Sequence, residues 1–324
     1  MTVTEISHAI KRNPIMPLDM DIVLNTHVNP SATKRRAATL ATRRSVKKNW
    51  QAAWLLKAIT CIDLTTLAGD DTPGNVRRLA AKGRQPVRQD ILEALGVADL
   101  GITVGAVCVY HTRIKDALEA LEGTSIPVAA VSTGFPAGLS PFKQRIEEIY
   151  ASVDAGAKEI DIVISREHVL QGNWQALYDE VCQMREACGE SHMKTILATG
   201  ELGPLWNVAM ASKVCMMAGA DFIKTSTGKE SVNATLEVSL IMTRAIREHF
   251  ERTGYKVGFK PAGGIRKAKE ALAWLILIKE ELGDAWLTPQ LFRFGASSLL
   301  GDIERQLSHH VTGRYAAKHH MPMG

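Results

Sequence analysis

Beyond residue 50, short apolar runs rich in β-branched residues alternate with longer segments of helical periodicity. The segments 142–153 and 235–247 are two of the predicted helices. Eight strands alternating with helices over about 250 residues are typical of a closed (β/α)8 TIM barrel in the α/β class. The predicted strands are Ala58–Thr65, Gly101–Tyr110, Pro127–Thr133, Glu159–Ile164, Lys194–Thr199, Asp221–Ser226, Lys256–Pro261 and Phe292–Ala296.

An open, doubly wound sheet is the alternative architecture for this alternation. Such sheets usually carry a Gly-x-Gly-x-x-Gly turn after the first strand. The residues after the first predicted strand read Leu67-Ala-Gly-Asp-Asp-Thr-Pro-Gly74, which lacks that turn. We therefore expect the closed barrel.

Charge divides the chain near residue 50. Residues 1–50 carry nine Lys and Arg against three acids, whereas residues 51–324 carry 30 against 31. We predict a basic, helical N-terminal extension over 1–50 and a barrel domain over 51–324. The densest basic stretch, 34–48, either contacts nucleic acid or another polyanion, or forms a solvated helix that covers one end of the barrel. We favour the second interpretation because no aromatic residues for base stacking are interleaved there.

Several classes of protein are not expected. The longest uncharged apolar stretch, Ala271–Ile278, is far shorter than the roughly 20 residues of a membrane-spanning helix. The first 30 residues lack the apolar core of a secretory signal. The five cysteines include no CxxC pair and no zinc-site spacing. We expect a cytoplasmic protein with reduced thiols, no membrane contact and no metal, and entry into the nucleus through 34–48 stays open.

Two lysines occupy similar positions at the ends of consecutive predicted strands, Lys224 in Asp221–Lys229 and Lys260 in Val257–Gly264. Burial of an ammonium group costs several kcal/mol, so its presence in a strand indicates a function. Two neighbouring cations and burial should lower both pKa values and leave one free amine, which can form a Schiff base with a carbonyl group. The alternative for each lysine is an amine that extends to the solvent at the rim.

Two acids and a cysteine lie in the same predicted strands. Asp161, among β-branched residues, could hold one lysine ionised and relay protons, or form only a structural ion pair. Asp63 has a similar setting, with a hydrogen-bonding scaffold as its alternative role. Nothing near Cys108 in the sequence would lower its pKa, so we expect it to line the pocket and not to act as a nucleophile.

Three consecutive loops carry glycine or hydroxyl clusters that could hold a phosphate group. In this architecture the loops after strands seven and eight usually bind phosphate through backbone N–H groups. Each cluster alone is more often a turn, but three together favour a phosphorylated substrate. Arg266 either adds charge to this site or is solvated. The candidate residues are Gly228 and Lys229 after strand six, Gly263 and Gly264 after strand seven, and Ser297 and Ser298 after strand eight.

These residues also carry a family resemblance. Over residues 55–315 the chain resembles the deoxyribose-phosphate aldolases, class I aldolases on a (β/α)8 barrel, and its basic arm and Gly313–Ala317 tail resemble the animal-type branch. The matching segments are Ile62–Leu67, Ala106–Tyr110, Glu159–Val163, Phe222–Lys229, Gly258–Gly264 and Phe294–Leu300.

The resemblance implies a role for each matching residue. Lys224 matches the Schiff-base lysine, Lys260 the lysine that tunes it, and Asp161 the proton-relaying carboxylate. The six glycine, lysine and serine candidates match phosphate-contacting positions. Bacterial members end in a tyrosine that assists proton transfer, whereas this chain ends His319-His-Met-Pro-Met-Gly324, and Tyr315 cannot be assumed to replace it.

The implied reaction is the reversible cleavage of 2-deoxy-D-ribose 5-phosphate to D-glyceraldehyde 3-phosphate and acetaldehyde, in deoxyribonucleoside catabolism. It makes the chain a carbon-carbon lyase without cofactor, and a homodimer is expected from the family. Two alternatives stay open. One keeps the Schiff base but changes the substrate, as in a transaldolase-like or dehydratase-like barrel. The other is an inactive scaffold that binds a phosphometabolite or RNA.

Overall fold

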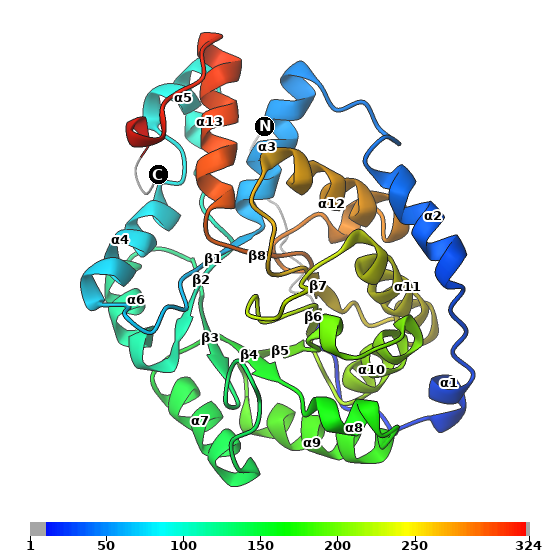
Figure 1. The fold of residues 1–324 in the computed structure, drawn as a ribbon. Coiled ribbons are helices and arrows are strands. Elements are labelled where there is room, and N and C mark those ends of the chain that lie inside the picture. The colour runs from blue at the N-terminus through cyan, green and yellow to red at the C-terminus, as the bar shows by residue number, and fades with distance from the viewer. Residues whose placement is uncertain (1–10, 322–324) are drawn as a thin grey trace.

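The protein, described over residues 11–321 by a computed structural model, is built around a barrel of eight parallel strands. Each strand pairs with its neighbours in chain order, and β8 returns to pair with β1 (Figure 1). Bridges between Phe259 and Phe292 and between Ala262 and Gly295 join β7 to β8, so the barrel closes as predicted. The strands are β1 (Ile62–Thr65), β2 (Ala106–Tyr110), β3 (Val128–Ser132), β4 (Glu159–Val163), β5 (His192–Ile196), β6 (Phe222–Lys224), β7 (Gly258–Lys260) and β8 (Phe294–Ala296).

Three strand predictions were wrong by three or more residues at one end. The second strand was predicted from Gly101, but β2 begins only at Ala106. The first apolar run was read as a strand from Ala58, but residues 58–60 end helix α3 (Lys48–Thr60). The last turn of α3 and strand β1 are both buried and apolar, so the sequence shows no break between them. The fifth strand ends at Ile196, because Ala198 has a left-handed backbone and residues 199–201 form a short 3-10 turn.

The connecting helices form the outer ring of the barrel (Figure 1). Helix α11, the longest, begins where the Thr235 side chain accepts a hydrogen bond from Val238 N, and it ends at Gly254, whose φ of 75° is left-handed. The ring helices are α4 (Pro73–Arg84), α5 (Gln89–Ala94), α6 (Ile114–Ala120), α7 (Phe142–Asp154), α8 (Arg166–Leu170), α9 (Trp174–Ala187), α10 (Leu205–Met217), α11 (Leu236–Thr253), α12 (Ala268–Glu281) and α13 (Leu299–Thr312).

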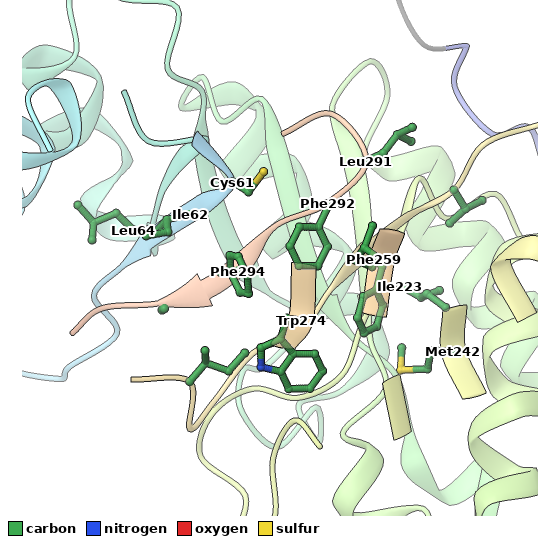
Figure 2. Packing of buried hydrophobic residues seen from close by; sticks show 14 of the residues in the cluster. Cys61, Ile62, Leu64, Ile223, Met242, Phe259, Trp274, Leu291, Phe292 and Phe294 are labelled. Atoms are coloured by element: carbon green, nitrogen blue, oxygen red, sulfur yellow. The ribbon is translucent and has the colours of Figure 1, made fainter. Parts of the chain in front are cut away.

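Aromatic side chains fill the space between the last two strands and the ring helices. The Phe259 and Phe292 rings stack with centroids 6.4 Å apart, and Phe294 meets Phe292 edge-on at 4.7 Å (Figure 2). All three are buried, and burying one such ring stabilises the fold by about 1.5–3 kcal/mol. Phe259 faces outward from the barrel. Because successive side chains of a strand point to opposite faces, the next residue, Lys260, faces the barrel interior.

The N-terminal arm lies along the outside of the ring. Helix α2 (Pro30–Leu40) packs against α11 and α12, and α1 (Met20–Leu24) packs against α10 (Figure 1). Arg36 binds Glu281 at 3.0 Å. Helix α2 ends at Leu40, so the predicted helical face over 34–48 extends only half that far, and it covers the side of the ring instead of an end of the barrel. The division of the chain at residue 50 stays a prediction.

The first described residues of the arm lie at the amino-terminal ends of β5 and β6. There Arg12 donates a hydrogen bond to Ser191 O at 2.7 Å, and Asn13 N donates one to Asp221 Oδ1 at 3.2 Å. Asn13 also contacts the His249 ring of α11 at 3.0 Å. Its Nδ2 group donates to two backbone carbonyls between α10 and β6. The arm is therefore held by polar contacts of Arg12 and Asn13 as well as by the ion pairs of Arg36 on α2.

Among the described residues, no helix combines the length and the apolarity needed to span a bilayer.

Candidate active site

Lys224 and Lys260 occupy paired register positions at the carboxyl ends of β6 and β7. Both side chains point into the barrel, and each Nζ lies 2.7 Å from the same atom, Oδ2 of Asp161 on β4. All three residues are buried. The predicted meeting of the two lysines and Asp161 is therefore present in the structure.

These residues belong to a larger ion network inside the barrel. Lys260 Nζ also lies 2.5 Å from Asp63 Oδ2 on β1. Lys194 on β5 bridges Glu159 Oε2 at 2.5 Å and Asp161 Oδ1 at 3.0 Å. The network is completed by Arg293, which binds Asp63 and, at 2.8 Å, Glu159 Oε1.

The charges of this network do not balance. Four basic side chains (Lys194, Lys224, Lys260 and Arg293) face three carboxylates (Asp63, Glu159 and Asp161). If every group were ionised, the interior would hold one excess positive charge, which is unfavourable in a buried site. Loss of one proton neutralises the network, and the lysine with the weakest carboxylate support should lose it.

Lys224 is that lysine. Burial and, after it, the Lys260 cation lower its pKa, and they outweigh the opposing attraction of Asp161. A lysine whose pKa is lowered is a neutral amine for a larger fraction of the time and is a better nucleophile.

The prediction that both lysine pKa values fall was wrong for Lys260. Burial favours its neutral form, but the carboxylates of Asp161 and Asp63 on either side raise the pKa above that of an ordinary lysine. Lys194, Lys224 and Lys260 outweigh burial at Asp161 and hold its pKa well below the usual range. Lys260 and Asp161 are therefore a charged pair beside an amine that loses its proton more readily than an ordinary lysine.

Cys108 lies near this site in a small apolar cluster. Its buried neighbours there include Ala129, Val131 and Val163. Burial raises the pKa of its thiol, and only weaker attractions from Lys260 and Lys224 oppose that rise. A buried thiol of raised pKa fits the expectation that Cys108 is not a nucleophile. It was also expected to line the pocket, but it is not among the residues that line the open pocket above the ion network.

An open pocket of about 210 Å³ lies above the ion network and is lined by Lys224. The loops after β6, β7 and β8 form its walls, as expected for the phosphate site of this architecture. Thr65 and Leu67 at the end of β1 also line it and were not predicted. All seven residues proposed for phosphate binding other than Cys108 meet in this pocket: Gly228, Lys229, Gly263, Gly264, Arg266, Ser297 and Ser298.

The glycine pair after β7 needs its glycines. Gly263 and Gly264 have φ values of +83° and +85°, which are left-handed conformations that other residues rarely adopt. A Cβ atom at Gly263 would lie 2.6 Å from the Asn233 side chain of the preceding loop.

Sequence reasoning missed Glu159, Lys194 and Arg293. Glu159 precedes Asp161 by two residues, and strand alternation places both on the same face. Lys194 and Arg293 stand within predicted strands as the two lysines do. The alternation of side chains along each strand could have placed all three in the barrel interior. Which acid pairs with which base depends on the register between strands, and the sequence does not give that register.

Tyr315 does not reach the pocket. Helix α13 starts beside Ser298 at the pocket and runs 14 residues away from it, a length of about 21 Å. Tyr315 follows the far end of that helix, where it is exposed and stacks on His309 with ring centroids 4.0 Å apart. The last residues, 322–324, lie outside the described part of the chain.

Within residues 11–321, no group of three His, Cys, Asp or Glu side chains is arranged to hold a metal ion. The interior carboxylates instead bind lysine and arginine side chains.

The fold and the site together have the parts of a Schiff-base-forming aldolase: a (β/α)8 barrel, a buried lysine of lowered pKa and an adjoining open pocket lined by glycine residues, Lys229 and Arg266. Residues 57–301 match the family model described as DeoC/LacD family aldolase. The chain belongs to this aldolase family.

Relatives with assigned names support the same conclusion. The chain is 65% identical over 308 residues to the deoxyribose-phosphate aldolase of Mus musculus, with 94% of this chain and 97% of the relative covered. It is 62% identical to the deoxyribose-phosphate aldolase of Homo sapiens at the same coverage. The fold is similar to the tetrameric deoxyribose phosphate aldolase from Aeropyrum pernix, with a TM-score of 0.59, 20% identity, and 85% of this chain and 98% of that chain covered.

Proposed function

We propose that the chain is a deoxyribose-phosphate aldolase that cleaves 2-deoxy-D-ribose 5-phosphate reversibly to D-glyceraldehyde 3-phosphate and acetaldehyde. The observation that carries this proposal is the position of Lys224, a lysine of lowered pKa that lines an open pocket of about 210 Å³. Relatives at 62–65% identity that bear this name support the choice of substrate.

Lys224 is proposed as the nucleophile. Its neutral amine adds to the carbonyl carbon of the open-chain sugar, and uptake of one proton with loss of water gives a positively charged imine. When the bond between the second and third carbons breaks, its electron pair moves into this imine and forms an enamine. The fixed positive charge stabilises the electrons that are released.

Asp161 and Lys260 are proposed to move the proton. The hydroxyl group on the third carbon loses its proton as that carbon becomes the aldehyde of glyceraldehyde 3-phosphate. Asp161 lies 2.7 Å from both lysine nitrogens and can pass the proton between them and a water molecule. The enamine then takes a proton on its terminal carbon, and hydrolysis releases acetaldehyde and free Lys224. Asp63 is proposed to hold Lys260 in place through their 2.5 Å contact.

The three loops around the pocket are proposed to bind the phosphate group. Backbone N–H groups of the glycine residues can donate to its oxygens, and Lys229 and Arg266 supply positive charge. Anchoring the far end of the sugar holds its carbonyl carbon near Lys224, which lowers the entropy cost of the reaction.

Borohydride reduction tests the nucleophile and the substrate together. Incubation with acetaldehyde and borohydride should add a two-carbon group to the tryptic peptide that contains Lys224, and Lys224→Leu should lose this adduct. Lys260→Leu should keep it. Undiminished adduct in Lys224→Leu would overturn the assignment.

The two alternative functions give different results in simple assays. A transaldolase-like or dehydratase-like barrel would trap other phosphosugars, and the mass of each reduced adduct identifies them. An inactive scaffold would show no turnover of 2-deoxy-D-ribose 5-phosphate. The chemistry of Lys224, Lys260 and Asp161 favours an active enzyme.

The arm supports a second, separate proposal, contact with a polyanion. Trp50 is 74% exposed at the start of α3, beside the exposed Lys47 and Lys48, and an aromatic ring among cations can stack on a base. Arg36 and Arg44 bind Glu281 and Glu280 and hold α2 in place, so they should be left intact in a test. Loss of RNA retention on replacement of Lys34, Arg35, Arg43 and Lys47 would support it, and unchanged retention would reject it.

Cytoplasmic or nuclear location and a homodimer stay predictions. Light scattering of the purified chain measures its mass in solution and tests the homodimer. Microscopy of the tagged chain, with and without residues 34–48, tests the location and the role of the basic stretch.

A further inference from the structure

The loop after β6 already has an anion on its backbone amides. The carboxylate of Glu230 accepts hydrogen bonds from Thr227 N at 3.0 Å and from Gly228 N at 3.1 Å. A second contact joins Thr227 N to its other oxygen at 3.1 Å. Both amides belong to residues that line the pocket proposed for phosphate.

We propose that Glu230 is an internal competitor of the substrate phosphate: its carboxylate takes the loop amides that the phosphate needs, and phosphate binding must displace it or do without them. This inference rests on the proposed function, which places the phosphate in this pocket. A carboxylate and a phosphate oxygen are alternative acceptors for the same backbone donors, so they compete for one position.

Both ways of binding weaken the affinity for phosphate. If Glu230 leaves, three charge-assisted contacts to Thr227 and Gly228 are lost before the phosphate gains any. If it stays, the phosphate lacks two donors and lies near a like charge. The sign of the effect therefore does not depend on whether Glu230 moves.

The arrangement discriminates between ligands. A phosphorylated sugar is held at two points, by its phosphate group and by the imine at Lys224, and it can overcome the competition. Inorganic phosphate has only the first of these. Glu230 would thus keep inorganic phosphate from filling the pocket while a sugar phosphate still enters it.

Glu230→Gln tests this directly, because it removes the charge but keeps an oxygen acceptor near the loop. We expect the dissociation constant of inorganic phosphate, measured by titration calorimetry, to fall about three- to tenfold, as for loss of one competing charge-assisted contact. KM for 2-deoxy-D-ribose 5-phosphate should fall in the same direction. KM for unphosphorylated 2-deoxy-D-ribose should not change.

Glu237→Gln is the matched control. Glu237 lies in the first turn of α11, beyond the pocket residues, so the variant loses the same charge without freeing the loop amides. It should bind phosphate as the parent protein does. An equal gain in affinity in Glu237→Gln would show a general charge effect and would overturn the proposal.

Weaker or unchanged phosphate binding in Glu230→Gln would also overturn it, since Glu230 would then only order the loop. Glu230→Ala provides a second variant and should show the same tightening if the loop keeps its shape. Calorimetry with phosphate needs no turnover. If the parent protein failed to cleave 2-deoxy-D-ribose 5-phosphate, the proposed reaction would fall while this test of Glu230 could still be read.

Discussion

Lys224 and Lys260 share one oxygen atom, Oδ2 of Asp161, at 2.7 Å from each nitrogen. Lys260 has Asp63 as a further partner and Lys224 does not, so the two similar lysines have opposite pKa shifts. The protein thus holds a charged lysine next to a lysine that loses its proton more readily. A reactive amine follows from the unequal sharing of carboxylates.

Lys260→Met should raise the pKa of Lys224. The change removes a neighbouring cation and leaves Asp161 to Lys224, and both effects favour the charged amine. Borohydride trapping of acetaldehyde requires the neutral amine, so its pH profile should move to higher pH. An unmoved profile would show that Lys260 does not tune Lys224. Lys229→Met, which removes a cation at the pocket wall, is the control and should leave the trapping profile in place while raising KM.

Lys194→Met should destabilise the protein by about 3–5 kcal/mol, because the buried carboxylates of Glu159 and Asp161 lose the ion-pair partner that they share. Urea unfolding measures the loss. The double variant Lys194→Met/Glu159→Gln should recover part of the lost stability, since one of the two carboxylates left without Lys194 then carries no charge. Lys143→Met removes an exposed ion pair and should change stability by less than about 1 kcal/mol. If Lys194→Met also changed stability by less than about 1 kcal/mol, the ion network would not contribute to stability as proposed.

The order of the strands and the location of the site could be predicted from the sequence, because both depend on local patterns. Eight β-branched runs separated by helical segments determine the barrel, and a barrel places Lys224 and Lys260 at the same edge. The loops with Gly263 and Ser297 follow for the same reason. Local periodicity carries this information without any knowledge of distant contacts.

The partners inside the barrel could not be predicted in this way. Arg293 meets Asp63, 230 positions away, only because β8 closes onto β1. The raised pKa of Lys260 likewise depends on carboxylates from distant strands, Asp161 on β4 and Asp63 on β1. The contact of Glu230 with the loop amides could not be predicted either, because it depends on the exact path of the loop after β6.

His249 should make stability depend on pH between about 6.5 and 4. Burial, and then the nearby Arg252, lower its pKa to about 4, so the folded protein favours the neutral ring that contacts Asn13. A base with a lowered folded pKa contributes stability above its unfolded pKa of about 6.5, and this stability is lost as the pH falls toward 4. The drop in Tm from pH 7 to pH 5 should be smaller in His249→Gln. An equal drop in both proteins would show that His249 is not the group responsible.

Gly263→Ala should weaken phosphate binding and destabilise the fold. Its φ of +83° is left-handed, and an added Cβ would lie 2.6–2.7 Å from the Asn233 side chain, including its Cβ atom, so that side chain would have to move. Asn233 donates to Glu230 O and ties the loop after β6, so both pocket loops would shift. We expect a loss of about 1–3 kcal/mol in unfolding free energy and a KM for the phosphorylated sugar raised about tenfold or more.

Gly301→Ala is the control: Gly301 lies in helix α13 with no atom within 4 Å of the added Cβ, so it should be neutral or slightly stabilising. Equal KM values in Gly263→Ala and the parent protein would remove the glycine pair from the phosphate site.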